Sequence, residues 1–296
     1  MQRRKAIQTL ASTPLLLGAT SFDTKDYKDQ KTANLKTSLN AYSFNKWLKS
    51  GKMSLDDLLQ FSSNAGFDAI DLTGYYLQGY PQAPADDYIF EVKRKAHKLG
   101  LDISGTGVRN DFTQADRGMR NQSIRHVMEW VDVAAKLGAP VLRVFAGRTE
   151  TTGDERNGML DWVIEGFKEC TQYAQTRGVI VAVQNHNHFI KTPEQTLEIL
   201  EAVNSDWFGL VLDTGSYRQG DLYANLEKMA PYAVNWQVKE LVTNNGKEED
   251  IDLDRLVRIV RNSGYKGYLP IETFGDSKFE ERVTSFLNKL QEAMKS

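Results

Sequence analysis

The sequence predicts a single closed (β/α)8 barrel. Short apolar segments alternate with amphipathic helical segments along most of the 296 residues, and no second composition regime appears. Such an alternation is typical of parallel α/β architectures, and the length suits one large barrel with small additions. Glycine is also placed where helices should end, just before the next apolar segment, because it adopts the left-handed conformation without a Cβ clash. These glycines are Gly66, Gly100, Gly138, Gly178 and Gly264.

Eight segments are expected to contain the strands of the barrel. Most read as continuous apolar runs, which indicates burial by helices on the outside of a parallel sheet. Residues 179–189, VIVAVQNHNHF, show the pattern best, because five apolar residues are followed abruptly by polar ones. The eight segments are 35–44, 67–74, 102–108, 139–147, 179–189, 208–217, 233–240 and 267–274.

The helices between these segments are indicated by capping residues and glycine stops. Ser54 is expected to cap the first long helix, with Asp57 near its positive end. Thr192 caps a later helix, where Gln195 should close a capping box, and Asp252 caps another after a charged loop. The expected helices cover about 54–65, 88–99, 118–137, 157–177, 221–230, 252–263 and 277–294, and a further helix is expected to begin at about residue 193.

Composition limits the classes of function. Apolar residues make up 41% and charged residues 26% of the chain, which is an ordinary globular balance. The net charge of −2 argues against a nucleic-acid partner, which normally requires a basic face. The single cysteine, Cys170, excludes an intrachain disulfide, and its position in an apolar helical stripe predicts a buried thiol.

The N-terminus predicts export. Arg3 and Arg4 precede an uncharged, partly apolar stretch that is too short to span a membrane. This arrangement suggests a twin-arginine signal, and hence a periplasmic protein that is not embedded in the membrane. We therefore expect a signal peptide over residues 1–22, a polar linker over 23–34 and the barrel over 35–296.

Four polar side chains are expected to converge on one end of the barrel. Gln184, Asp213, Gln237 and Glu272 lie at or near the ends of successive predicted strands, where the active sites of such barrels lie. A buried carboxylate is costly unless it is paired or binds a cation. Four oxygen ligands, two of them charged, suit Mn²⁺, Mg²⁺ or Ca²⁺ better than Zn²⁺, with Mn²⁺ or Mg²⁺ preferred. The alternative is a hydrogen-bonded polar layer without metal.

Other polar residues near these strand ends are candidates for catalysis and binding. His186 and His188 lie two apart, so in extended backbone they point the same way. Lys239 shares the strand face of Gln237, and a lysine can act as base or electrostatic clamp. The candidate catalytic residues are Glu272, His186, His188 and Lys239. The residues predicted to bind substrate are Arg143, Asn185, Ser216 and Glu240.

From residue 35 to about 293 the chain resembles the sugar phosphate isomerases/epimerases of the xylose-isomerase-like TIM-barrel superfamily. The resemblance is carried by the motifs VAVQNH, VLDTGSY, WQVKE and GYKGYLPIET. It implies a TIM barrel with a divalent metal held by Glu, Asp, His and Glu from the fifth to eighth strands. Gln184 replaces the first glutamate and Gln237 the histidine, while Ser216 stands where many members have another histidine. These changes should lower metal affinity.

The predicted activity is metal-assisted proton transfer next to the carbonyl of a keto-sugar or related polyol derivative, giving isomerisation, epimerisation or β-elimination/hydration. A glutamine cannot abstract a proton, so a scheme with two opposed glutamates is excluded. One remaining base favours a lyase or hydratase outcome, or isomerisation by one shared base. The alternative is a non-catalytic sugar-binding barrel. A metal-dependent nuclease would need more histidines than the four present and a basic face. The sequence leaves an oligomer open.

Overall fold

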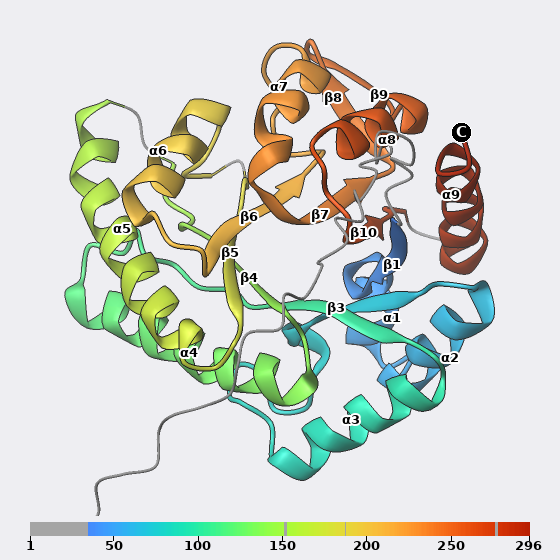
Figure 1. Cartoon of the computed structure of the whole chain (residues 1–296). Coiled ribbons are helices and arrows are strands. Elements are labelled where there is room, and N and C mark those ends of the chain that lie inside the picture. Colours follow the sequence, from blue (N-terminus) through green and yellow to red (C-terminus); the bar gives the residue numbers. More distant parts are fainter. Residues whose placement is uncertain (1–34, 151–152, 187, 276–277) are drawn as a thin grey trace, which may run out of the picture. The chain divides into compact units, whose positions relative to one another are not determined.

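The protein forms a closed barrel of eight parallel strands, which confirms the predicted single (β/α)8 TIM barrel (Figure 1). The computed structural model describes residues 35–150, 153–186, 188–275 and 278–296. Around the barrel the strands follow the order β1-β10-β7-β6-β5-β4-β3-β2, so the last strand closes onto the first. The strands are β1 (Lys36–Asn40), β2 (Ala69–Thr73), β3 (Asp102–Gly107), β4 (Val141–Val144), β5 (Ile180–Gln184), β6 (Phe208–Asp213), β7 (Ala233–Lys239) and β10 (Tyr268–Glu272).

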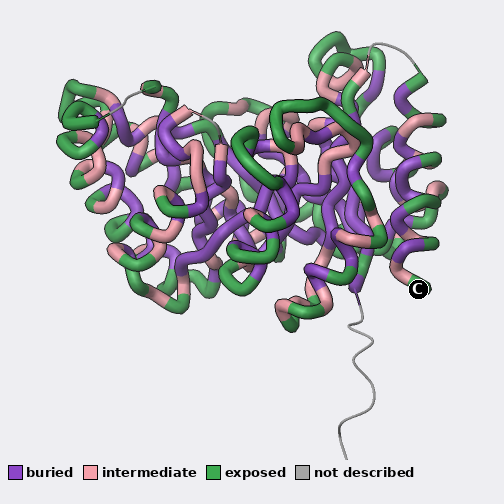
Figure 2. The backbone as a smooth tube through the Cα atoms, turned by 90° about the horizontal axis from the view of Figure 1, so that it is seen from above, coloured by how far each residue is buried: buried purple, intermediate pink, exposed green. Residues whose placement is uncertain are grey.

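Helices surround the barrel and bury their apolar faces against it. In Figure 2 the buried stretches gather in the interior, while the outer turns are exposed. The α-helices are α1 (Asn45–Ser50), α2 (Leu55–Ala65), α3 (Asp86–Lys98), α4 (Arg117–Leu137), α5 (Asp154–Gln175), α6 (Pro193–Val203), α7 (Leu222–Met229), α8 (Leu253–Asn262) and α9 (Phe279–Ala293). Short 3-10 helices are η1 (Ala41–Phe44), η2 (Gly74–Tyr76) and η3 (Ala230–Tyr232).

Most of the predicted capping bonds form. The Ser54 hydroxyl accepts from the Asp57 amide at 3.1 Å, and the Asp57 carboxylate accepts from the Ser54 amide at 2.9 Å. Thr192 likewise accepts from the Gln195 amide, but the Gln195 side chain accepts from the amide of Lys191 instead of that of Thr192. The predicted capping box at Thr192 is therefore incomplete, because the Gln195 side chain bonds the amide of the preceding residue, Lys191.

The apolar core is divided by the strands into two layers. The larger layer lies between strands and helices and contains Trp130, Phe167 and Cys170, all fully buried. The smaller cluster consists of Val141, Ala182 and Val211. Each of these three lies two residues before a polar residue at the end of its strand, on the same face, because side chains alternate along a strand. An apolar plug therefore underlies the polar end of the barrel.

Two elements differ from the sequence-based expectation. The predicted charged loop after β7 is an antiparallel hairpin, β8 (Leu241–Asn244) and β9 (Lys247–Asp250). Its turn, Asn245-Gly246, has φ of 49° and 77°, and Asn-Gly is the preferred pair for such a tight turn. A short helical segment, η1 followed by α1, was also not predicted between β1 and α2.

Two further predictions concern the cysteine and the N-terminus. Cys170 is buried as predicted, and burial raises the pKa of its thiol, which disfavours a nucleophilic role. The predicted signal peptide and linker lie outside the described residues. Among the helices that the structure describes, none combines the length and apolar character needed to cross a membrane.

Candidate active site

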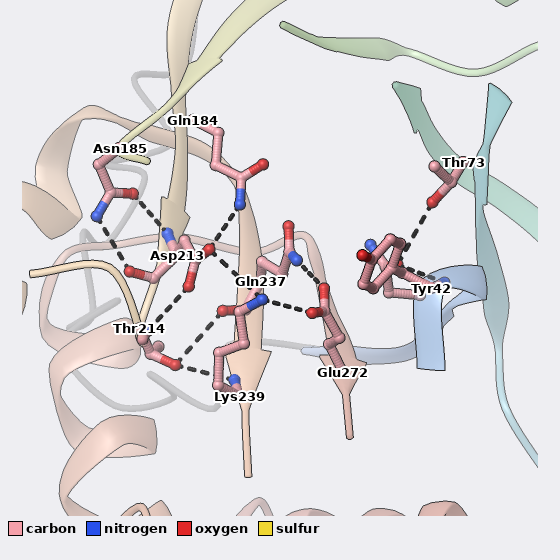
Figure 3. A network of polar contacts seen from close by, with 11 residues as sticks. Tyr42, Thr73, Gln184, Asn185, Asp213, Thr214, Gln237, Lys239 and Glu272 are labelled. Carbon is pink, nitrogen blue, oxygen red and sulfur yellow. Dashed lines mark hydrogen bonds and ion pairs between the residues drawn. The ribbon is translucent and has the colours of Figure 1, made fainter. Parts of the chain in front are cut away.

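A cavity of about 820 Å³ opens at the carboxyl ends of the barrel strands. Its floor comes from the last inward-facing residues of most barrel strands, as expected for this fold. These residues are Asn40, Thr73, Arg143, Gln184, Asp213, Gln237, Lys239 and Glu272. The structure thus brings together the four residues predicted to converge, and adds Lys239 to them (Figure 3).

Asp213, at the end of β6, is almost fully buried and surrounded by donors. Its Oδ2 accepts from Gln184 Nε2 at 2.6 Å, and its Oδ1 accepts from the Gly215 amide at 2.8 Å. Asn185 holds its backbone, since the Asn185 amide side chain donates to the Asp213 carbonyl at 3.1 Å and accepts from the Asp213 amide at 2.7 Å. The carboxylate is therefore fixed in position before any ligand binds.

The carboxylate of Glu272, at the end of β10, is also held by two hydrogen bonds. Its Oε2 accepts from Gln237 Nε2, and its Oε1 accepts from Lys239 Nζ at 2.5 Å. Burial raises the pKa of Glu272, while the nearby Lys239 charge works against that rise. Figure 3 shows Tyr42 and Thr73 on the side of Glu272 away from Gln237.

Lys239 lies between the two carboxylates. Besides its contact with Glu272, its Nζ is 3.6 Å from Asp213 Oδ2. All three line the cavity, and Lys239 is the most exposed of them, with 12% of its side chain exposed against 1% for Asp213 and 2% for Glu272. Burial opposes its charge, but the two carboxylates outweigh burial and raise the pKa of Lys239. The lysine is therefore charged at neutral pH.

Arg143 reaches the cavity from β4, as predicted. Its guanidinium donates to Tyr75 Oη at 3.0 Å and to the Val108 carbonyl at 2.8 Å. It also lies 4.4 Å from the ring centroid of Phe145. Gly107 makes this position possible, because a Cβ there would come within 2.7 Å of the guanidinium. A fixed, cationic fork of this kind suits an oxygen-rich ligand.

The two predicted histidines also line the cavity. Their rings are stacked with centroids 4.8 Å apart. Burial, as the largest cause, lowers the pKa of His186 to about 4, so its imidazole is neutral at neutral pH. His188 lies nearer the rim, with Nδ1 3.8 Å from Glu150 Oε1.

Of the four residues predicted to bind substrate, two line the cavity and two do not. Ser216 lines the cavity together with Arg143. Asn185 does not, because it is fully buried and both polar atoms of its side chain are bonded to the Asp213 backbone. Glu240 is also placed elsewhere, since its carboxylate accepts from Arg282 Nε at 2.5 Å. In this structure Asn185 and Glu240 therefore bond neighbouring elements, and their predicted role in substrate binding stays a prediction.

Several cavity residues had not been predicted. Aromatic and cationic side chains from outside the barrel strands also line it: Tyr42, Tyr75, Arg109, Arg148, Arg218 and Phe274. The β8–β9 hairpin adds Leu241, Val242, Thr243 and Glu248. The tyrosines after β2 could be recognised from sequence as either rim packing or site lining, and Tyr75 does both.

The arrangement fits a divalent metal poorly. Both glutamines turn their NH2 groups toward carboxylates, as they must when the partner only accepts hydrogen bonds. The ammonium of Lys239 occupies the space between the acids, and like charge disfavours a second cation there. Within the described ranges, no group of three or more His, Cys, Asp or Glu side chains could hold a metal. These donors do not favour the predicted Mn²⁺ or Mg²⁺, and direct titration is the test of that prediction.

The fold and this site can now be compared with known proteins. The family model described as xylose isomerase-like TIM barrel matches residues 59–294. A xylose isomerase from Thermus caldophilus is 31% identical over 114 residues, which is 34% of this chain and 29% of that isomerase. The matched region thus covers less than a third of the length of that isomerase.

Solved structures agree on the fold. D-psicose 3-epimerase with D-tagatose, from Clostridium cellulolyticum H10, superposes with a TM-score of 0.73 at 16% identity, covering 88% of this chain and 99% of the epimerase. A 3-keto-D-glucoside 4-epimerase from E. coli gives 0.70 at 14%, covering 88% and 99%. A Mycobacterium smegmatis barrel protein in complex with magnesium gives 0.66 at 18%, covering 90% and 100%.

The family model and the solved structures define the class of protein, a xylose isomerase-like TIM barrel. The chain belongs to the xylose isomerase-like TIM barrel family.

Proposed function

We propose that this protein is a sugar isomerase/epimerase-type enzyme that moves a proton next to the carbonyl of a small keto-sugar. The observation that carries the proposal is the buried trio of Asp213, Lys239 and Glu272 at the floor of a polar cavity. A charged donor flanked by carboxylates can polarise a carbonyl oxygen and stabilise the enediolate that forms on deprotonation. The sugar-processing relatives named above support the same class of substrate.

The chemistry needs a base beside the polarised carbonyl. Glu272 and His186 both reach the cavity, and the raised pKa of Glu272 suits proton abstraction near neutral pH, whereas the lowered pKa of His186 makes it the weaker base. Gln184 cannot abstract a proton, so a second carboxylate base is missing from β5. A single base that removes and returns the proton is compatible with isomerisation. Loss of a neighbouring group, the lyase or hydratase outcome, finds no support among the relatives named above.

Hydrogen exchange tests the proposal. The purified protein is incubated with candidate keto-sugars in D2O and followed by NMR. We expect deuterium to enter the carbon next to the carbonyl, and Glu272→Gln to slow this by about 10²–10⁴-fold, the usual contribution of a positioned base. An unsaturated product would show the lyase outcome. Sugar binding without any exchange would instead favour the second candidate, a non-catalytic sugar-binding barrel.

We also propose that the protein is exported through a twin-arginine signal. Arg3, Arg4 and the uncharged stretch that follows them support this proposal. An exported enzyme would meet unphosphorylated sugars.

A further inference from the structure

The position of Lys239 suggests what has replaced the metal of this family. We propose that the Lys239 ammonium is a built-in cation that takes the place of a divalent metal and polarises the carbonyl oxygen of the sugar. The proposal rests on the proposed function of the same site. Its observation is the ammonium held 2.5 Å from Glu272 Oε1 and 3.6 Å from Asp213 Oδ2, between the two acids to which the family resemblance assigns the metal.

The hydrogen bonding of the two carboxylates agrees with this assignment. All four carboxylate oxygens face a donor of the protein: the Gly215 amide, Gln184, Gln237 and Lys239. A glutamate on β5 and a histidine on β7 would be metal ligands, whereas the glutamines found there donate to carboxylates. The two glutamines and the lysine therefore belong together. The single positive charge of Lys239 replaces the two of a divalent metal, and Gln184 in place of a glutamate removes one negative charge, so the net charge of the site is unchanged.

Neighbouring residues hold the lysine in this place. The Lys239 amide donates to Thr214 Oγ1 at 2.9 Å, which fixes the end of β7 against β6. Gly215 leaves room for the lysine stem, since a Cβ there would lie 2.8 Å from Lys239 Cγ. The ring of Phe274 lies over the ammonium, with its centroid 4.8 Å from Nζ. The lysine is thus guided toward the carboxylates rather than into solvent.

The ammonium has a hydrogen left for the sugar. It carries three N–H groups; Glu272 takes one and Asp213 lies near another, so one remains for a ligand oxygen in the cavity. During turnover the base takes the proton from the carbon next to the carbonyl, the electron pair moves to the carbonyl oxygen, and Lys239 stabilises the charge that forms there. The proton then returns to carbon, so no other reactant is needed.

Mn²⁺ titration by calorimetry, with electron paramagnetic resonance of free Mn²⁺ as second readout, tests the assignment. The wild type should bind no Mn²⁺ at this site up to millimolar concentration. Lys239→Met vacates the space between the acids, so it should bind one Mn²⁺ on the order of 100-fold more tightly than wild type. Lys239→Arg keeps the positive charge and should bind no Mn²⁺. Lys228→Met is the matched control, because Lys228 pairs with Glu194 on the surface.

The outcomes separate cleanly. Tight binding of one Mn²⁺ by wild type, no weaker than by Lys239→Met, would overturn the proposal. Absence of Mn²⁺ binding by a folded Lys239→Met would also overturn the proposal, because the ammonium would then not be what excludes the metal. If Lys239→Met does not fold alone, purification in Mn²⁺ decides: the proposal expects the metal to restore the circular dichroism spectrum of the wild type, and failure to do so contradicts it. None of these readouts requires turnover, so they are independent of the proposed activity.

Discussion

At the scale of single residues, Arg143 illustrates how one side chain is prepared for a ligand. Its guanidinium is held by Tyr75 and the Val108 carbonyl while still lining the cavity. Lysine cannot reproduce the planar fork. We expect Arg143→Lys to weaken sugar binding by about 10- to 100-fold, the value of hydrogen bonds to a charged group. Tyr75→Phe, which removes only the supporting hydroxyl, should have a smaller effect, and equal binding by wild type and Arg143→Lys in calorimetry would refute this role.

Asp71 on β2 gives the barrel interior a pH dependence. Burial raises its pKa to about 6, with Arg143 opposing the rise and Glu272 adding to it. An acid whose pKa is raised in the folded state holds its proton more tightly there, so its contribution to stability is lost as pH rises from about 4 through about 6. Asp71→Asn removes this dependence.

The expected size follows from the shift of about two pKa units. Between about pH 4 and pH 8, the free energy of unfolding of wild type should fall by about 2–3 kcal/mol relative to Asp71→Asn. Urea unfolding of both proteins at the two pH values measures this difference. A constant difference would mean that Asp71 titrates normally in the folded protein.

At the scale of elements, the approach of η2 to α4 depends on a missing side chain. A Cβ at Gly74 would lie 2.6 Å from Cζ3 of the fully buried Trp130, whose indole donates to the Pro81 carbonyl at 3.0 Å. Gly74→Ala should therefore lower the free energy of unfolding by about 1–3 kcal/mol, as overpacking does.

A second glycine supplies the matched control. Gly158 lies within α5, and nothing is within 4 Å of the position of its Cβ. Gly158→Ala should raise the free energy of unfolding by about 0.5–1 kcal/mol, because alanine is the better helix former. Chemical unfolding of both variants should show opposite signs, and destabilisation by both would contradict the packing argument at Gly74.

The elements also show what local sequence signals can and cannot predict. Strands such as β5 and caps such as Ser54 follow from a few adjacent residues, so the barrel could be predicted. The β8–β9 hairpin was missed because all four residues of β9 are charged and exposed, although its Asn-Gly turn was visible. The partner of Glu240, Arg282, lies 42 residues away and could not be inferred from local pattern. Likewise, Lys239 could be assigned to the site, but its place between both acids depends on Gly215 and the β6–β7 register.

At the scale of the whole molecule, export should be visible in the mature chain. The signal predicted over residues 1–22 would be removed in transit, leaving the polar linker ahead of the barrel. N-terminal sequencing of the protein from its native host should begin between about Thr20 and Asn34. An intact Met1 in a cytoplasmic fraction would rule export out, and replacing Arg3 and Arg4 by lysine should block it.

The barrel as a whole places one cation and two carboxylates under a cavity that suits a sugar. The measurement that tests this most directly is the crystal structure of the protein soaked with a keto-sugar. The account predicts sugar in the cavity, its carbonyl oxygen within hydrogen-bond distance of Lys239 Nζ and its hydroxyls near Arg143. Sugar density elsewhere on the protein, or a sugar in the cavity with its carbonyl turned away from Lys239, would contradict the account.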